Sequence, residues 1–161
     1  MEQVIKKVIS KIKPSQVEKR DFVKVTNKFL NKLNSKLSDA KAILGGSGAK
    51  GTWLSGGHDV DIFVQFNFKK YSSQSTELSN FLEKALRKSF PNKRMKRVHG
   101  SRDYFQFVYN KLNFEVVPIL KIRRAQEELS LTDISPLHSV WVNKNAKKLK
   151  DDIRLAKQFC K

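Results

Sequence analysis

The stretch Leu44–Phe66, LGGSGAKGTWLSGGHDVDIFVQF, places two acidic residues at the start of an apolar segment, shortly after a glycine-rich turn. The β-branched and aromatic residues of 60–66 predict a buried strand. Side chains two positions apart on a strand point to the same face, so Asp59 and Asp61 are expected to project together into one site. Surface acids at a strand start are the alternative, which the apolar neighbours make less favourable.

Two carboxylates held this close repel each other unless a positive group lies between them. Their hard oxygen atoms suit Mg²⁺, which binds through one or two carboxylates together with substrate phosphates. Glu115 is the candidate third acid, because it is the sole charge in the apolar segment NFEVVPIL. That segment is expected to run beside the first strand. The alternative for Glu115 is a salt bridge to one of the many basic side chains.

The glycine turn before these acids has the composition of a phosphate-binding loop. Glycines at 45 and 46 let the backbone approach a triphosphate closely, and backbone N–H groups with the Ser47 hydroxyl can hold its oxygens. Lys50 follows one turn later as a counter-charge. Gly46, Ser47 and Lys50 are therefore candidate nucleotide-binding residues.

The charge of the chain indicates a polyanionic partner. Its 161 residues include 33 Lys and Arg against 15 Asp and Glu, a net charge of +18. A surplus of this size favours RNA or DNA, with an anionic membrane surface as the weaker alternative. No apolar run reaches transmembrane length, and the first residues lack a signal-peptide pattern. The single cysteine, Cys160, excludes an internal disulfide and a cysteine metal cluster. We expect a cytoplasmic protein without a membrane partner.

Hydrophobic periodicity predicts an α+β fold. Ser15 and Glu18 form a capping box for a helix that carries an apolar stripe as far as Leu37. Ser135-Pro136 predicts the start of a later helix, with Ser135 as its N-cap. A hairpin turn is predicted at Asn110-Lys111. The expected strands are 41–45, 59–66, 103–109 and 112–120, and the expected helices are a first one that ends before Pro14, the capped helix, 75–90 and a basic helix from about 144.

Four blocks of the sequence, GGSGAKGTWL, DVDIFV, FEVVPI and SPLHSVW, occur in an order and spacing that resemble one known family. They are similar to the nucleotidyltransferase domain of the archaeal, class I CCA-adding enzymes, members of the polymerase β-like superfamily. The resemblance covers nearly the whole chain. It implies a mixed sheet flanked by helices, with a catalytic domain at 1–120 and, at 121–161, a connecting segment and the start of a helical central domain.

The same resemblance implies an activity and a set of roles. The activity is template-independent nucleotidyl transfer from CTP and ATP to the 3′ end of a tRNA that lacks CCA. Asp59, Asp61 and Glu115 match the acids that hold two Mg²⁺ ions in the family. Ser47 and Lys50 match residues of the glycine turn that contact the triphosphate. The resemblance also assigns two residues of the following helical segment to the nucleotide phosphates, His138 and Lys157.

The sequence departs from the family pattern at three points. Glu115 stands where many relatives have aspartate, and Gly48 replaces an aromatic residue of the turn. The chain is also shorter than family members, which continue through further domains. It could therefore be one half of a split enzyme completed by a second polypeptide, a truncated chain, or a minimal relative with another substrate.

Two clusters of basic residues are candidate RNA-binding groups: Lys93, Arg94, Lys96 and Arg97, and the pair Arg123 and Arg124. For the first cluster, a solvated edge strand protected by lysines is the alternative. The functional alternatives are a minimal nucleotidyltransferase that acts on a protein or another RNA, and a non-catalytic RNA-binding module.

Overall fold

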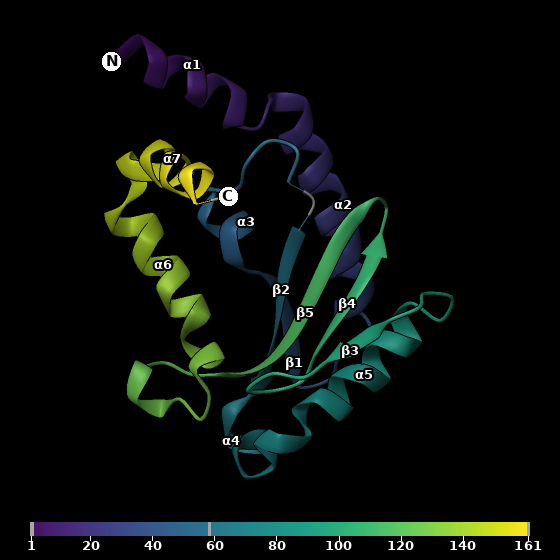
Figure 1. Cartoon of the computed structure of the whole chain (residues 1–161). Helices are drawn as coiled ribbons and strands as arrows, with labels where there is room; N and C mark the ends of the chain where they lie inside the picture. The colour runs from purple at the N-terminus through teal and green to yellow at the C-terminus, as the bar shows by residue number, and fades with distance from the viewer. Residues whose placement is uncertain (1, 58, 161) are drawn as a thin grey trace.

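A mixed five-stranded sheet forms the centre of the protein, in the order β1-β2-β5-β4-β3 (Figure 1). The computed structural model describes residues 2–57 and 59–160. The strands β2 and β5 are parallel, whereas the other neighbouring pairs are antiparallel. The predicted α+β class and mixed sheet are confirmed. The strands are β1 (Ala40–Leu44), β2 (Asp59–Asn67), β3 (Lys96–Val98), β4 (Tyr104–Tyr109) and β5 (Leu112–Lys121).

Helices precede the sheet, connect its strands and follow it. The α-helices are α1 (Glu2–Ile12), α2 (Gln16–Asn34), α3 (Gly46–Lys50), α4 (Phe68–Tyr71), α5 (Leu78–Ser89), α6 (Ser135–Asn145) and α7 (Lys150–Phe159). Short 3-10 turns are η1 (Ser72–Glu77), η2 (Ala125–Glu127), η3 (Leu131–Ile134) and η4 (Lys147–Leu149). No helix in the described part of the chain is long and apolar enough to cross a membrane.

The hydrophobic core lies between one face of the sheet and the helices α2 and α5. Phe29 of α2 is 0% exposed at its centre. Its ring stacks on Phe114 of β5, with centroids 4.1 Å apart, and on Phe90, with centroids 4.7 Å apart. Along β2 the side chains of Val60 and Ile62 enter this core. The acids that alternate with them therefore belong to the opposite face of the sheet.

The predicted start of α2 and the predicted hairpin are confirmed. The Ser15 hydroxyl accepts the backbone N–H of Glu18, and the Glu18 carboxylate accepts the backbone N–H of Ser15. Asn110 and Lys111 both have positive φ, at 47° and 67°. This conformation matches the right-handed twist of the strands that the turn connects. The helix ends at Asn34, so Leu37 follows it rather than extending its stripe.

Two helix starts differ from the prediction. Ser135 is the first residue of α6 rather than its N-cap, which is Ile134. The capping box lies one turn earlier, where Ser130 pairs with Asp133 at η3. The final helix begins at Lys150 rather than near 144, because α6 continues through Asn145. The 3-10 turns η3 and η4, which precede these two helices, are not revealed by hydrophobic periodicity.

The C-terminal helices pack against N-terminal elements. The helix α6 contacts α3, and α7 contacts α1. Figure 1 shows α7 next to α3, near the end of β2 that carries Asp59. The division into domains at 1–120 and 121–161 stays a prediction, and residue 161 lies outside the described residues. In the structure, its boundary falls at the end of β5.

Candidate functional site

The acids of the opening stretch and Glu115 lie on neighbouring parallel strands. Asp61 of β2 is the register partner of Glu115 of β5, and Asp59 is the partner of Asn113. Residues paired in this way project from the same face of a sheet, about 4.8 Å apart along the hydrogen-bonding direction. The structure therefore brings Asp59, Asp61 and Glu115 to one end of one face.

Neutral amides hold two of these carboxylates. The Gln106 amide on β4 donates from Nε2 to Glu115 Oε1 at 2.6 Å, and the Asn113 amide donates from Nδ2 to Asp59 Oδ1 at 3.2 Å. The three acids lie on two neighbouring strands and do not surround a common point. Within residues 2–57 and 59–160, no three or more His, Cys, Asp or Glu side chains are gathered as a metal-binding group. The assignment of Asp59, Asp61 and Glu115 as metal ligands stays a prediction.

Asp61 is held in an environment that disfavours its charge. Burial raises the pKa of this carboxyl above its usual value, and the negative charge of Asp59 raises it further. The backbone N–H of Ser47 opposes the rise in pKa by hydrogen bonding, and the positive charges of Lys157 and Lys50 oppose it as well. This half-buried acid thus lies near Ser47, Lys50 and Lys157, which were predicted to bind phosphate. A cation at this position would favour the ionised carboxylate.

The two glycines before Ser47 are required by the sheet itself. The Gly45 N–H donates to the Asp61 carbonyl oxygen at 2.8 Å, which joins the turn to β2. A Cβ atom on Gly45 would overlap the Phe63 ring, and one on Gly46 would overlap the Asp61 carboxylate. Gly46 also has a φ of +49°, which other residues rarely adopt. Sequence reasoning explained these glycines by approach of a triphosphate, but the structure adds their contact with β2.

An open cleft of about 280 Å³ lies beside this turn, lined by Ser47, Trp53, Leu54, Gly57, Asp59 and Lys157. It joins three predicted site residues from α3, β2 and α7. Burial lowers the pKa of the Lys157 ammonium, and the positive charge of Lys50 lowers it further. Two ammonium groups that repel each other beside a cleft favour a polyanionic ligand. His138 does not line this cleft; it is exposed on α6.

The predicted RNA-binding residues do not form one surface with the cleft. Lys93, Arg94 and Lys96 are exposed in and before β3, at the far edge of the sheet. Arg123 and Arg124 are exposed beyond the end of β5, whose other end is paired with Asp59. At 3.3 Å per residue, the ten residues of β5 separate its two ends by about 30 Å.

Arg97 is bound in a salt-bridge network. Its Nε donates to Asp103 at 2.8 Å, and its Nη1 donates to Glu83 at 3.2 Å. Both acids neutralise the guanidinium, so Arg97 offers less charge to a phosphate than the sequence suggests. For Lys96 and Arg97, which lie in β3, the alternative of an exposed edge strand describes the geometry.

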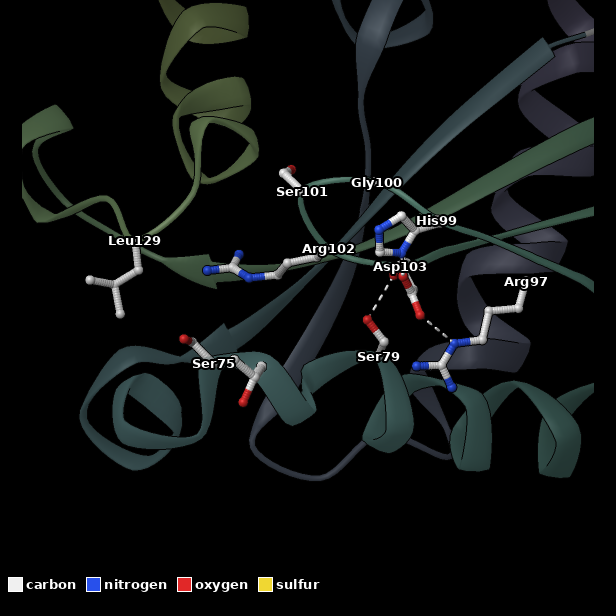
Figure 2. A pocket seen from close by; sticks show the side chains of 10 residues that line it. Ser75, Ser79, Arg97, His99, Gly100, Ser101, Arg102, Asp103 and Leu129 are labelled. Atoms are coloured by element: carbon white, nitrogen blue, oxygen red, sulfur yellow. Dashed lines mark hydrogen bonds and ion pairs between the residues drawn. The ribbon is translucent and has the colours of Figure 1, made fainter.

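A second pocket, of about 240 Å³, lies between the 99–103 loop and the segment formed by η1 and α5 (Figure 2). Its charged side chains are occupied with one another. Arg102 donates to both carboxylate oxygens of Asp133, and Asp103 accepts hydrogen bonds from Arg97 and His99. Ser79 donates to the Asp103 carbonyl oxygen at 2.7 Å. These contacts fasten the 99–103 loop to α5 and η3, and we interpret the pocket as structural.

Sequence reasoning missed the residues that hold the site in place. Gln106 binds Glu115 from the neighbouring strand β4, and Arg154 of α7 donates to backbone carbonyl oxygens of the loop after α3. No local motif marks either residue. Only the strand register and the packing of α7 identify them.

Comparison with known proteins agrees with this geometry. The family model described as nucleotidyltransferase domain matches residues 26–133. A CCA-adding enzyme of Nanoarchaeum equitans is 48% identical over 118 residues, which is 73% of this chain and 28% of that protein. The CCA-adding enzyme of Methanosarcina mazei is 29% identical over 160 residues, 94% of this chain and 34% of that protein. The chain thus spans about a third of the length of these relatives.

Solved structures share the fold. The structure of E. coli MS115-1 CdnC with ATP superposes with a TM-score of 0.70 and 25% identity, covering 96% of this chain and 56% of that one. Cid1, described by its RNA terminal uridylyl transferase activity, gives a TM-score of 0.66 at 15% identity, covering 96% and 45%. The predicted resemblance to the archaeal CCA-adding enzymes is confirmed. The chain belongs to the nucleotidyltransferase domain family, whose model matches most of its length.

Proposed function

We propose that this chain carries the nucleotidyl-transfer centre of a CCA-adding activity, which transfers nucleotides from CTP and ATP to the 3′ end of a tRNA lacking CCA. The observation that carries the proposal is the cleft lined by Ser47, Asp59 and Lys157. It lies beside the paired acids Asp61 and Glu115. The 48% identity to the Nanoarchaeum equitans CCA-adding enzyme supports the choice of substrate.

The phosphates of the nucleotide are assigned to the turn and its neighbouring lysines. The backbone N–H of Gly46 and the Ser47 hydroxyl would bind phosphate oxygens. Lys50 and Lys157 would supply positive charge, and the mutual repulsion that lowers the Lys157 pKa would be relieved by the bound anion. Held in this way, the α-phosphorus would face the attacking 3′-hydroxyl in line with the leaving pyrophosphate. His138 remains the predicted additional phosphate ligand.

Asp59, Asp61 and Glu115 are the residues that would hold Mg²⁺. The fit is one of donor chemistry, because three carboxylates share one face and the charged form of Asp61 is disfavoured by burial and by Asp59. Glu115 and Asp59 would rotate away from their amide partners to bind a metal. Two bound Mg²⁺ ions would lower the pKa of the attacking hydroxyl and offset the charge on the pyrophosphate.

The remaining length of the relatives bears on how the tRNA is held. This chain matches 34% of the Methanosarcina mazei enzyme. We propose that segments equivalent to the rest contribute to tRNA binding, supplied by a second polypeptide or by a continuation of this one. The net charge of +18 supports direct contact of this chain with RNA as well.

The proposal is tested first by nucleotide binding. With Mg²⁺ and CTP or ATP at 100 times Kd, the native chain should gain about 2.7 kcal/mol of stability by linkage. The readout is the rise in melting temperature. Asp59→Asn should lose most of this rise, whereas Asp21→Asn, an exposed acid of α2, should keep it.

Transfer itself is measured with labelled CTP or ATP and a tRNA transcript lacking CCA, on a sequencing gel. Addition of C, C and A that is abolished in Asp59→Asn supports the proposal. Extension at the parental rate in that variant would contradict the assigned site. Addition of nucleotides to another RNA or to a protein, with no addition to tRNA, would instead favour a nucleotidyltransferase of different substrate. Binding of RNA without any effect of CTP or ATP would favour a non-catalytic module.

A further inference from the structure

Arg154 is a buried cation whose donors point at the loop beside the proposed nucleotide site. Its side chain is 5% exposed. Nε donates to the Trp53 carbonyl oxygen at 3.1 Å, and Nη2 donates to the Gly51 carbonyl oxygen. Nη1 pairs with Asp151, which also binds Lys13 at 2.8 Å. One guanidinium therefore connects α7 to the loop after α3.

Neighbouring residues donate to the same loop. Asn143 of α6 donates from Nδ2 to the Ala49 carbonyl oxygen at 3.0 Å, and its own Oδ1 accepts a hydrogen bond from Lys150 at 3.1 Å. Lys157 Nζ lies 3.4 Å from the Thr52 carbonyl oxygen. The carbonyl groups of 49, 51, 52 and 53 thus all accept from side chains of α6 and α7.

These donors matter because α3 is too short to be stable without contacts to the rest of the protein. It has five residues, GSGAK, of which two are glycines. A helix of this length is well below what is stable alone. The carbonyl groups of Ser47 and Gly48 accept the backbone N–H groups of Thr52 and Gly51, whereas the Ala49 carbonyl accepts the Asn143 amide. The same helix carries Ser47 and Lys50. Its start is fixed by the contact of Gly46 with Asp61, and its end is fixed by Asn143 and Arg154.

We propose that Arg154 is a positioning residue for nucleotide binding, which fixes the far end of α3 so that Ser47 and Lys50 face the cleft. The inference rests on the function proposed above. The forked guanidinium group of Arg154 is essential, because it binds two carbonyl oxygens and one carboxylate in different directions. Lysine keeps the charge but cannot reach all three acceptors.

The test compares Arg154→Met and Arg154→Lys with a variant that loses a buried ion pair elsewhere. Asp133→Asn is the matched control, because Asp133 binds buried Arg102 at the opposite end of the sheet. Leu78→Ala, a core substitution in α5, replaces it if the first control fails to fold. Two readouts are needed: hydrogen exchange of the amides of 47–53, and the Kd of Mg²⁺-ATP by calorimetry together with KM and kcat.

We expect exchange of the 47–53 amides to accelerate at least about 10-fold in Arg154→Met, with a smaller change in Arg154→Lys. The Kd and KM for ATP should rise by a similar factor while kcat at saturation falls less, and the matched control should change neither. Parental exchange and Kd in Arg154→Met, at a melting temperature as low as that of the control, would overturn the proposal. If the parental chain binds no nucleotide, the proposed function fails, and the exchange result alone then confirms or refutes positioning of α3.

Discussion

Glu18 holds the loop that leads into β2, and its replacement by glutamine tests the electrostatic account of that loop. Its carboxylate accepts the Ser15 N–H at 2.8 Å, the Ser55 hydroxyl at 2.8 Å and the Gly56 N–H at 3.0 Å. Two of these donors belong to the segment just before Asp59. The side chain therefore closes the capping box of α2 and binds this loop at the same time.

The hydrogen bonds set the size of the expected effect. They lower the pKa of Glu18 from 4.5 to about 2, with the Ser15 backbone N–H as the largest contribution. At about 1.4 kcal/mol per pH unit, the upper bound on the stabilisation is about 3 kcal/mol. Because the carboxylate is near the surface, screening by solvent reduces this value to about 1–2 kcal/mol. Glu18→Gln should lower the free energy of unfolding by that amount at pH 7.

The effect has a defined pH window. The folded pKa lies below the unfolded one, so the stabilisation is fully present above pH 4.5 and is lost as the pH falls through about 2. Urea unfolding of the parental chain and of Glu18→Gln should therefore differ at pH 7 and converge towards pH 2–3. Glu2→Gln is the matched control, since Glu2 also begins a helix but is 81% exposed. A difference that stays constant with pH, or one no larger than that of the control, would refute the reasoning.

Further predictions concern the core and the far end of the sheet. Asp133 is 1% exposed, and its carboxylate accepts hydrogen bonds from Arg102 and from the backbone N–H groups of Leu120, Leu129 and Ser130. Asp133→Asn should therefore lower the free energy of unfolding, measured with urea, by about 3–5 kcal/mol. Phe29→Ala removes the ring at the centre of the core and should cost about 3–5 kcal/mol by the same measurement. Thr26 is 2% exposed, and its hydroxyl has no partner among the described residues. Thr26→Val should thus leave stability unchanged or raise it by up to about 1 kcal/mol, and a loss above 1 kcal/mol would show that the hydroxyl is bound.

Features that depend on neighbours in the chain could be predicted from the sequence. The capping box at Ser15 and Glu18, the Asn110-Lys111 turn and the buried strand that begins at Asp59 all follow from local patterns, and the structure contains each of them. Local sequence patterns gave a wrong prediction where a residue distant in the chain determines the structure. Ser135 reads as an N-cap, but the cap preceding this region is formed by Ser130 and Asp133, whose carboxylate also binds Arg102 far away in the chain.

The candidate site shows the same difference between features that depend on chain neighbours and features that depend on distant residues. The acids could be identified from their residue type and spacing. Arg154, which binds the loop after α3, could not, because it lies 101 residues from Trp53 in the chain. Charges counted in the sequence are also not all free in the folded chain. Arg97 is basic in the sequence but is neutralised by Asp103 and Glu83, which are brought to it by α5 and by the loop before β4.

The pairing of Asp61 with Glu115 is specified by the core on the other face of the sheet. In β5, Phe114 and Val116 are buried on either side of Glu115, and in β2, Val60 and Ile62 are buried on either side of Asp61. A slip of β5 by one residue would move Glu115 into the core and expose Phe114, which stacks on Phe29. The aromatic core therefore excludes every register that separates the two acids by an odd number of residues. The pairing of the two acids is thus stabilised by hydrophobic burial on the opposite face of the sheet.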